Sequence, residues 1–362
     1  MPASYGAAGS DDAHGLLAAC WRPVRVAVTG ASGFIGSRVC RGLADAGHSV
    51  VAVVRPSSDR SALEGCDCEL RIGDVTDQDS LRSAFSGADA VVHCAAVVDA
   101  YGNPWAARSV TWIGTYNVCH AATDSGSRQF VHMSTLAVYA RDNPQGVRLD
   151  EDTARLMKEP PLYDTYSPNK AAAERFAADF GRNGRMSVAI LRPGVVYGSG
   201  GPTVRRIADA INNRRLACVG SRHNRLPLIY VDDVAGATLA ALERPPKKAR
   251  AFNINGPEDV TWGRLLDAVA RAMGTAPTAA PVIPVRLART AAWAVEQWWS
   301  IRKKEGSPPL NRFIIDAIGR DSPVDISRAR NELGWEPRVG LQEGVRRAVA
   351  DLRSRGLEPY KA

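Results

Sequence analysis

Tyr166 and Lys170 stand four residues apart, and their side chains are of types that can do acid–base chemistry. Residues at this spacing share one face of a helix, so a helix here would bring the phenol and the ammonium group together. A positive charge beside a phenol stabilises phenolate and lowers the phenol pKa from about 10 toward neutrality. The pair would then serve as an acid and a base, although the spacing alone is common and needs support from other motifs.

Two hydroxyl residues upstream are further candidates for this chemistry. Ser134 and Thr135 follow a short apolar run that ends at Met133. A hydroxyl group both donates and accepts hydrogen bonds, so either side chain suits a substrate oxygen. The candidate catalytic residues are therefore Tyr166, Lys170, Thr135 and Ser134.

A glycine-rich segment follows the first predicted strand and opens the first predicted helix. Gly30 allows a tight turn, Gly33 lets the backbone approach a pyrophosphate, and Gly36 allows close packing of the helix on a sheet. The helix N-terminus offers free N–H groups to the anion. Because strand, loop and helix agree here, we predict dinucleotide binding rather than a purely structural turn. The same loop adds the candidate contacts Ser32, Phe34 and Ile35.

The residue after the second predicted strand bears on the choice of cofactor. Proteins that bind NAD usually place an acid there, whereas this chain has Arg55, followed by Ser57 and Ser58. A guanidinium fork matches phosphate oxygens, so Arg55 is suited to the 2′-phosphate of NADP. We therefore favour NADP over NAD. The alternative is that Arg55 is a solvated surface residue.

Further cofactor contacts are expected at the ends of the third and fourth predicted strands. Asp74 could accept a hydrogen bond from an adenine amino group, or it could cap the helix that follows. Val75 and Ala95 are small or apolar residues where a cofactor would cross the sheet edge. We interpret His93 as a packed strand residue, because no second residue of a metal-binding type accompanies it. We predict no metal site.

Short β-branched runs alternate with amphipathic stretches, as in parallel strands joined by helices. The predicted strands are residues 24–28, 50–54, 69–72, 90–94, 130–133, 188–191 and 252–254. Between the first two, Ile35, Val39 and Leu43 lie on one helix face, and Gly47 marks the end of that helix. The predicted fold class is α/β, a Rossmann-type doubly wound parallel sheet with a smaller C-terminal substrate-binding lobe.

Breaks rich in Pro and Gly suggest the domain organisation. We predict a flexible N-terminal extension over residues 1–22 and a dinucleotide-binding domain over 23–192 plus about 231–254. The substrate-binding lobe would comprise 193–230 plus about 255–362. Asp232 and Asp233 precede an apolar helix, so we expect them to cap it rather than to act as catalytic acids.

Composition excludes several other classes of protein. The chain has 362 residues, 45% of them hydrophobic and 23% charged, which is typical of a globular protein. No apolar stretch approaches the ~18 residues of a membrane-spanning helix. The net charge of +8 is scattered and no nucleic-acid module is present, so we predict no nucleic-acid partner. Seven irregularly spaced cysteines fit a reducing, cytoplasmic environment.

Taken together, these motifs resemble the extended short-chain dehydrogenase/reductase family, also called the NAD-dependent epimerase/dehydratase superfamily. The resemblance runs from about residue 24 to 344 and includes the segments 191–198, 230–234, 252–256 and 332–337. It implies hydride transfer between a nicotinamide and the substrate carbon that bears the oxygen. It also implies that Tyr166 exchanges the proton, Thr135 holds the oxygen, and Lys170 bonds the nicotinamide ribose. Pro193 and Val195 become further candidate cofactor contacts.

Two positions depart from the family pattern. Thr111 stands where the family often has Asn, which puts the role of that Asn in doubt, although Thr111 could still hold a water. Val195 stands where nucleotide-sugar enzymes typically carry an Asn, and an apolar side chain cannot bond a diphosphate.

The segment 281–310 resembles the C-terminal part of the 3β-hydroxysteroid dehydrogenase-like branch. It contains Trp293, Trp298 and Trp299, followed by the basic residues 302–304. These indoles could roof an apolar pocket, touch a membrane surface, or pack into a core.

The resemblance implies an NAD(P)-dependent oxidoreductase that interconverts a secondary alcohol and a ketone on a lipophilic substrate, such as a steroid, a terpenoid or an acyl-derived ketone. One alternative is a nucleotide-sugar epimerase, dehydratase or reductase. Another is a non-catalytic dinucleotide-binding regulator, because fold does not fix function. Peripheral membrane contact and a homodimer are also considered, the latter only because family members often pair through two helices.

Overall fold

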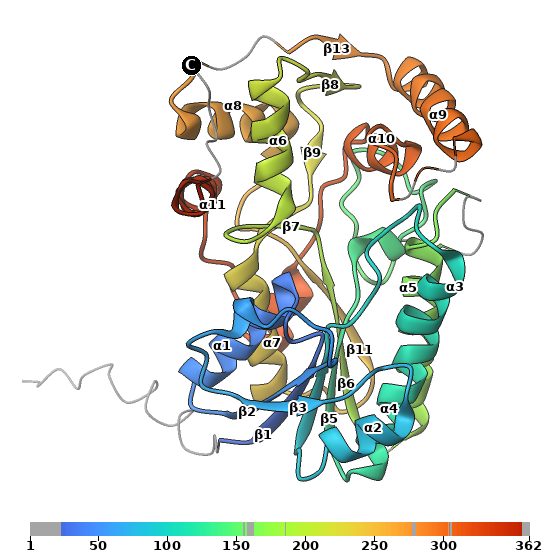
Figure 1. The fold of residues 1–362 in the computed structure, drawn as a ribbon, viewed down its shortest axis with the longest axis vertical. Helices are drawn as coiled ribbons and strands as arrows, with labels where there is room; N and C mark the ends of the chain where they lie inside the picture. The colour runs from blue at the N-terminus through green and yellow to red at the C-terminus, as the bar shows by residue number, and fades with distance from the viewer. Residues whose placement is uncertain are drawn as a thin grey trace, which may run out of the picture.

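The computed structural model describes residues 23–154, 156–157, 163–184, 186–276, 280–302, 304 and 306–356. The predicted N-terminal extension, residues 1–22, lies outside these ranges, as does Lys303 of the basic group after the tryptophans. The described chain forms a lower half built on a sheet and an upper half of helices and short strand pairs (Figure 1).

Seven strands form one sheet in the order β11-β6-β5-β4-β1-β2-β3, and every neighbouring pair is parallel. The strands are β1 (Arg25–Thr29), β2 (Ser49–Val54), β3 (Glu69–Ile72), β4 (Ala90–His93), β5 (Gln129–Met133), β6 (Ser187–Pro193) and β11 (Arg250–Ile254). The predicted α/β fold and all seven predicted strands are confirmed. The strand order reverses between β1 and β4, and ligands of such sheets bind at the carboxyl ends of the strands beside this point.

Helices cover both faces of the sheet. On one face lie α1 (Phe34–Asp45) and α7 (Val231–Glu243), and on the other lie α2 (Gln78–Ala84), α4 (Gly114–Asp124) and α5 (Ser167–Asn183). Strand side chains alternate between the two cores, since Val26 and Val28 face α1 and α7 while Ala27 faces the opposite side. Both faces are therefore apolar, which explains why the strands read as continuous hydrophobic runs. The short α3 (Pro104–Ala107) and a π-helical turn, η2 (Arg108–Ile113), lead into α4.

The upper half is assembled from later segments. A second core joins α6 (Pro202–Asn212), α8 (Trp262–Met273) and α11 (Leu341–Ser354), while α9 (Val285–Ile301) packs against α10 (Arg312–Ile318). Short strands pair as β7 (Val195–Tyr197) with β10 (Leu228–Tyr230), β8 (Cys218–Val219) with β13 (Val282–Ile283), and β9 (Arg225–Leu226) with β12 (Val260–Thr261). Single turns complete the chain at η1 (Ser61–Leu63), η3 (Leu136–Val138) and η4 (Ala329–Leu333).

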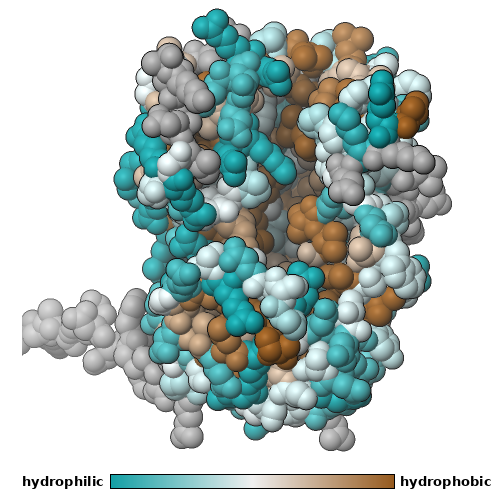
Figure 2. All heavy atoms as spheres, in the orientation of Figure 1, coloured by the Kyte–Doolittle hydropathy of each residue, from teal (hydrophilic) through white to brown (hydrophobic). Residues whose placement is uncertain are grey.

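In the view of Figure 2, a groove runs down the upper half of the molecule, between the side that carries α6 and the side that carries α9 and α10 (Figure 1). Hydrophobic residues lie along this groove. In the ranges that the structure describes, no helix is both long and apolar enough to cross a membrane.

The prediction that Asp232 and Asp233 form an N-cap pair is wrong. Tyr230 occupies the N-cap position of α7, and both acids lie within the first helical turn. The Asp233 carboxylate accepts hydrogen bonds from the backbone N–H groups of Arg338 and Val339, at 2.9 and 3.0 Å. Its role is to hold the segment before α11 against α7, a long-range contact that local sequence does not reveal.

A buried ion pair ties α5 to the sheet. Glu174 of α5 meets Arg192 of β6 at 2.5 Å, and both side chains are almost completely buried. The Ser134 hydroxyl donates to Glu174 at 2.5 Å, and Arg192 also donates to the Tyr139 hydroxyl at 2.9 Å. Tyr139 in turn donates to Asn253 of β11 at 2.8 Å. The network therefore connects α5 to three neighbouring strands or strand ends.

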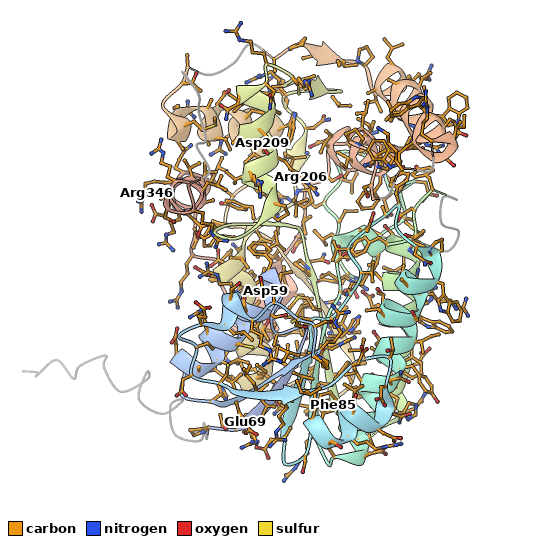
Figure 3. All side chains as sticks on the ribbon, viewed as in Figure 1. Asp59, Glu69, Phe85, Arg206, Asp209 and Arg346 are labelled. Carbon is orange, nitrogen blue, oxygen red and sulfur yellow. The ribbon has the colours of Figure 1, made fainter. Side chains whose placement is uncertain are left out.

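We predict that Glu174→Ala will destabilise the fold by about 3–5 kcal/mol, because it leaves the Arg192 charge buried without its partner. Urea unfolding followed by circular dichroism measures the change. The matched control is Glu343→Ala on α11, which removes an exposed partner of Arg346 (Figure 3) and should leave the unfolding free energy within error of the wild type. Equal behaviour of the two variants would contradict the prediction.

Candidate active site

Tyr166 and Thr135 lie together at the edge of a cavity of about 400 Å³. Tyr166 is the N-cap residue of α5, and Thr135 is the N-cap residue of η3, directly after β5. The Thr135 hydroxyl lies beside the Tyr166 phenol and acts to lower the phenol pKa. The structure therefore brings a phenol and a hydroxyl from distant segments to one point at the carboxyl end of the sheet, with open space in front of them.

Asp164 orients the start of the helix that carries Tyr166. One of its oxygens accepts hydrogen bonds from the backbone N–H groups of Tyr166 and Ser167, at 3.0 and 2.9 Å. The other oxygen accepts a hydrogen bond from Arg141 at 2.7 Å, and the carboxylate is fully buried. Asp164 thus does the work of a capping residue. Sequence reasoning missed it, although an Asp just before a predicted helix is a recognisable signal.

Lys170 is buried, and its ammonium group donates to the backbone carbonyl of Met133 at 2.5 Å. Burial lowers the pKa of Lys170 to about 8, while the nearby Cys94 and Glu174 act in the opposite direction. Burial raises the pKa of Tyr166 to about 12, with the Thr135 hydroxyl opposing the shift. The expected fall in the Tyr166 pKa is thus not seen, because desolvation dominates, the Asp164 charge also raises the pKa, and the Lys170 ammonium group is directed to the Met133 carbonyl. The phenol is neutral, the form that donates a proton.

The two candidate hydroxyls have different surroundings. Ser134 is buried and donates to Glu174, and it is absent from the cavity lining. Thr135 lines the cavity and accepts a hydrogen bond from the backbone N–H of Ala137 at 3.2 Å. The structure therefore brings Thr135 to Tyr166 and leaves Ser134 in the network that anchors α5.

The glycine loop forms a cradle at the start of α1. Gly30 has a φ of +66°, and a Cβ atom there would lie 2.7 Å from the backbone nitrogen of Ala95. A Cβ at Gly36 would lie 2.8 Å from the carbonyl carbon of Gly30, and Gly33 caps α1 without a side-chain hydrogen bond. Close backbone packing and an uncapped helix N-terminus are what a pyrophosphate requires, so the loop fits a dinucleotide.

The other predicted residues of this loop have partly different neighbours. Ser32 lies half-exposed beside the helix N-terminus. Phe34 and Ile35 are half-buried and pack against the core of the upper half. They therefore also join the two halves of the molecule.

Asp74 follows β3 and forms a local turn. One of its oxygens accepts hydrogen bonds from the backbone N–H and the hydroxyl of Thr76, both at 2.8 Å. Asp77, not Asp74, caps α2, so the alternative that Asp74 caps this helix is wrong. The carbonyl of Val75 accepts a hydrogen bond from Asn117 at 2.8 Å, which joins this turn to α4.

Arg55 is exposed and directly follows β2. This strand pairs with β1, the strand that leads into the glycine loop. Its backbone N–H donates to the Ser58 hydroxyl at 3.1 Å, which fixes the turn. Within the described part of the chain, its guanidinium group has no ionic partner. Its charge is therefore available for an external phosphate.

His93 is a packed strand residue at the end of β4. Thr115 donates its hydroxyl proton to the Thr111 carbonyl at 2.7 Å, so it can only accept from His93 Nε2, at 3.0 Å. Nδ1 then accepts from Thr29 at 2.7 Å. Burial, with a smaller effect of the Lys170 charge, lowers the pKa of His93 to about 3, so the ring is neutral. Among the described residues, no group of three or more metal-binding side chains is found.

The tryptophans of α9 do not fill a core. Trp293 is 50% exposed and Trp298 is 46% exposed, while Trp299 donates to the Gly306 carbonyl at 3.0 Å. They do not belong to the cavity lining, so the two alternatives of a core and a pocket roof are wrong for Trp293 and Trp298. Lys304 lies 4.4 Å from the ring centroid of Trp298. Exposed indole rings near a basic side chain suit a membrane surface, so peripheral membrane contact through α9 stays a prediction.

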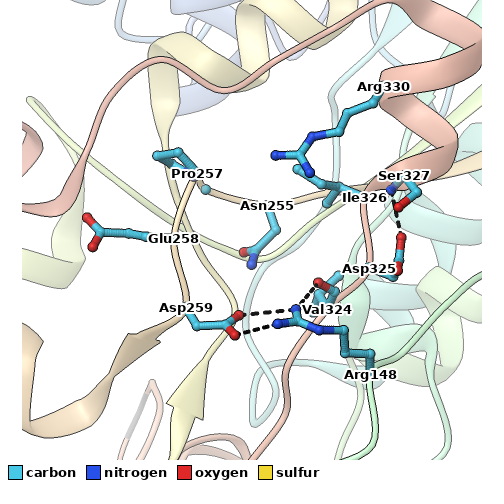
Figure 4. Close-up of a pocket in the computed structure, with 11 residues that line it drawn as sticks. Arg148, Asn255, Pro257, Glu258, Asp259, Val324, Asp325, Ile326, Ser327 and Arg330 are labelled. Atoms are coloured by element: carbon cyan, nitrogen blue, oxygen red, sulfur yellow. Dashed lines mark hydrogen bonds and ion pairs between the residues drawn. The ribbon is translucent and has the colours of Figure 1, made fainter.

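A second, polar pocket of about 280 Å³ is shown in Figure 4. Arg148 spans part of it and pairs with Asp259 at 2.6 Å. Its flanking residues Val147 and Leu149 line the first cavity instead, because side chains of an extended segment alternate. Tyr166 and Thr135 also line only the first cavity, which is therefore the candidate active site.

Pro193 and Val195 end β6 and begin β7, and both line the first cavity. Most of the cavity wall is apolar. Its larger apolar side chains are Val98, Leu136, Val147, Leu149, Val195 and Phe313.

Comparisons with known proteins identify the same architecture. Residues 26–255 match the sequence pattern described as the NAD dependent epimerase/dehydratase family. The chain is 30% identical over 334 residues to a 2-alkyl-3-oxoalkanoate reductase of Stenotrophomonas maltophilia, which covers 90% of this chain and 99% of that protein.

A second relative is a 3 beta-hydroxysteroid dehydrogenase/Delta 5→4-isomerase of Mycobacterium tuberculosis. It is 29% identical over 338 residues, covering 89% of this chain and 88% of that protein. Among solved structures, the crystal structure of gox2253 superposes with a TM-score of 0.77 at 27% identity, covering 94% of this chain and all of that one.

We predict that Gly36→Ala will weaken NADPH binding at least tenfold, because the added methyl group collides with the Gly30 carbonyl and opens the cradle. Fluorescence titration with NADPH measures the change. Gly42→Ala on the same helix is the matched control, since its Cβ would lie 3.4 Å from that of Ala235. Wild-type affinity in a folded Gly36→Ala protein would contradict the prediction.

Proposed function

Because the chain belongs to the NAD-dependent epimerase/dehydratase family, we propose that this enzyme reduces a ketone on a lipophilic substrate to a secondary alcohol with NADPH. The observation that carries the proposal is the pairing of Tyr166 with Thr135 at the edge of a largely apolar cavity. Family membership makes the chain an NAD(P)-dependent enzyme of the extended short-chain dehydrogenase/reductase type. The substrate, the direction and the preference for NADP are our proposal.

The glycine cradle of Gly30, Gly33 and Gly36 would hold the pyrophosphate of the dinucleotide, with Ala95 beside it. When bound, the nicotinamide supplies the hydride for reduction or accepts it in the reverse reaction. Arg55 would bond the 2′-phosphate of NADP, because it lies at the end of β2 with its charge unpaired in the described chain.

The chain's own residues provide the proton and hold the substrate oxygen. Tyr166 donates the phenol proton to the carbonyl oxygen, which suits reduction because the half-buried phenol is neutral. Thr135 hydrogen-bonds the same oxygen and keeps it in front of the phenol. Asp164 fixes the backbone at Tyr166, so it is a positioning residue rather than a catalytic one.

Lys170 supplies a charge behind the phenol. At pH 7 its ammonium group is mostly protonated, since its pKa is about 8, and it is anchored to the Met133 carbonyl. A cation at this place stabilises the negative charge that Tyr166 acquires as its proton leaves. It would also bond the nicotinamide ribose.

The lipophilic substrate class rests on the cavity wall and on the named relatives. The wall is formed largely by aliphatic side chains and Phe313, which favour an acyl chain or a fused ring system. The two relatives are named for an oxoalkanoate and for a steroid. Val195 argues against a sugar nucleotide, because it presents no polar atom to a diphosphate.

We predict that Tyr166→Phe will lower kcat for ketone reduction by about 10²- to 10⁴-fold, because it removes the proton donor. NADPH consumption against a panel of steroid, terpenoid and acyl ketones measures turnover. NADPH affinity should stay at the wild-type value, as a control that the fold and cradle are intact. Full turnover in the variant would refute the assigned mechanism, and UDP-glucose epimerisation by the wild type would overturn the substrate class.

We predict that Arg55→Ala will weaken NADPH binding about tenfold or more and leave NADH binding nearly unchanged, because hydrogen bonds to charged groups contribute about 1.5–3 kcal/mol. Titration of both cofactors measures the ratio. Arg60→Ala, a few residues further on the same exposed loop, is the matched control. A wild-type preference for NADH that is unchanged in Arg55→Ala would rule out NADP selection by this residue.

A further inference from the structure

Arg320 lines the candidate active-site cavity but is not neutralised there. Its guanidinium group is half-buried and donates to two backbone carbonyls, those of Arg141 and Asn143, the latter at 2.5 Å. In the described ranges it forms no ion pair with a carboxylate. The backbone carbonyls fix the orientation of the guanidinium plane, but they are neutral groups and do not replace an ion-paired carboxylate.

The acidic residues of the cavity lining are already engaged elsewhere. Asp316 pairs with both Arg141 and Arg289, and Asp321 pairs with Arg225 at 2.6 Å. Their negative charge is therefore used by other arginines, and it does not balance Arg320.

A second cation faces the same space. Arg206 of α6 (Figure 3) lines the cavity and has no hydrogen-bonded or ionic partner in the described part of the chain. It is more exposed than Arg320, which places it toward the opening of the cavity. An apolar cavity that keeps two unpaired guanidinium groups carries a net positive charge and attracts an anion.

Partial burial adds to this attraction. Burial lowers the pKa of Arg320, the Arg141 charge lowers it further, and the opposing effect of the Asp142 carboxylate does not cancel these two. A guanidinium group in this condition gains more from a bound anion than one in water, because charge-assisted hydrogen bonds strengthen as water is excluded.

We propose that Arg320 binds a carboxylate carried by the lipophilic substrate, so that the substrate is a keto acid with an aliphatic body. This inference rests on the proposed ketone reduction at the same site. A carboxylate is favoured because it matches the planar fork of one guanidinium group, and because the remaining wall is apolar and suits a hydrocarbon chain. Arg206 would attract the anion as it enters.

A guanidinium group also binds diphosphates, so the test must distinguish a carboxylate ligand from a diphosphate ligand. Octanoate, 1-octanol and UDP-glucose serve as probes of a carboxylate, a neutral chain and a diphosphate. Each is titrated into the full-length protein with NADP⁺ bound, and binding is followed by saturation-transfer NMR. This arm needs no turnover, so it tests the anion site even if ketone reduction fails.

We expect octanoate to bind the wild type more tightly than 1-octanol does. Arg320→Gln should weaken octanoate binding about 10- to 100-fold and change 1-octanol binding little, since only the charged hydrogen bonds are lost. Arg320→Lys keeps the charge without the fork and should show an intermediate loss. Equal binding of the acid and the alcohol by the wild type, or binding of UDP-glucose alone, would overturn the proposal.

The matched control is Arg148→Gln. Arg148 lies on the other side of the wall, in the polar pocket of Figure 4, so its loss removes a nearby charge without touching the cavity. It should leave octanoate binding within about twofold of the wild type, a change too small to count as loss of a hydrogen bond. An equal loss in both variants would assign the effect to general electrostatics and not to a site at Arg320.

A kinetic arm distinguishes this inference from the proposed function. Oxidation of a 2-alkyl-3-hydroxy acid and of its methyl ester by NADP⁺ is compared in the wild type and in Arg320→Gln. A rise of KM for the acid alone supports the carboxylate site. If neutral ketones and alcohols react but acids and esters behave alike, only the carboxylate site fails. If no alcohol or ketone reacts, the proposed function fails instead.

Discussion

The buried pair of Glu174 and Arg192 is the interaction on which the candidate site depends. It fixes the middle of α5 against β6, and the start of α5 carries Tyr166 as its N-cap residue and Lys170 in its first turn. Removing two charges from water is costly, so such a pair stabilises a fold weakly but makes any other arrangement unfavourable. Here Ser134 and Tyr139 satisfy further hydrogen bonds of the pair. The pair therefore specifies where α5 lies more than it contributes to net stability.

Position alone does not give Tyr166 its chemistry, because its surroundings decide which protonation state is present. Burial keeps the phenol neutral, and the Lys170 ammonium is turned to the Met133 carbonyl. The Tyr166 phenol therefore keeps its proton until an acceptor is bound beside it, and the Lys170 charge then stabilises the phenolate. The neutral phenol is the form that can donate a proton, and this state follows from desolvation, which the spacing of Tyr166 and Lys170 does not reveal.

Local patterns predicted the parts of the fold that local physics controls. The seven strands follow from β-branched runs that a parallel sheet buries on both faces, and the cradle follows from glycines whose positions admit no Cβ. Features that depend on distant partners were not predicted. Asp164 needs Arg141 to complete its role, and Asp233 bonds a segment more than a hundred residues away. The exposure of Trp298 likewise depends on how α9 packs against α10.

Residues 147–149 separate the two pockets, and their alternating side chains place apolar and charged groups on opposite sides of the backbone. The segment containing Arg148 lies beside the segment containing Val324, with Leu149 bridged to Val324. Alternation sends Val147 and Leu149 to the substrate cavity and Arg148 to the polar pocket, where Asp259 neutralises it. Arg320 precedes the second segment and is oriented by carbonyls instead of by an acid. Among the residues that the structure describes, Arg320 thus lines the apolar cavity without an ion-paired carboxylate, and this is the feature on which the proposed carboxylate site rests.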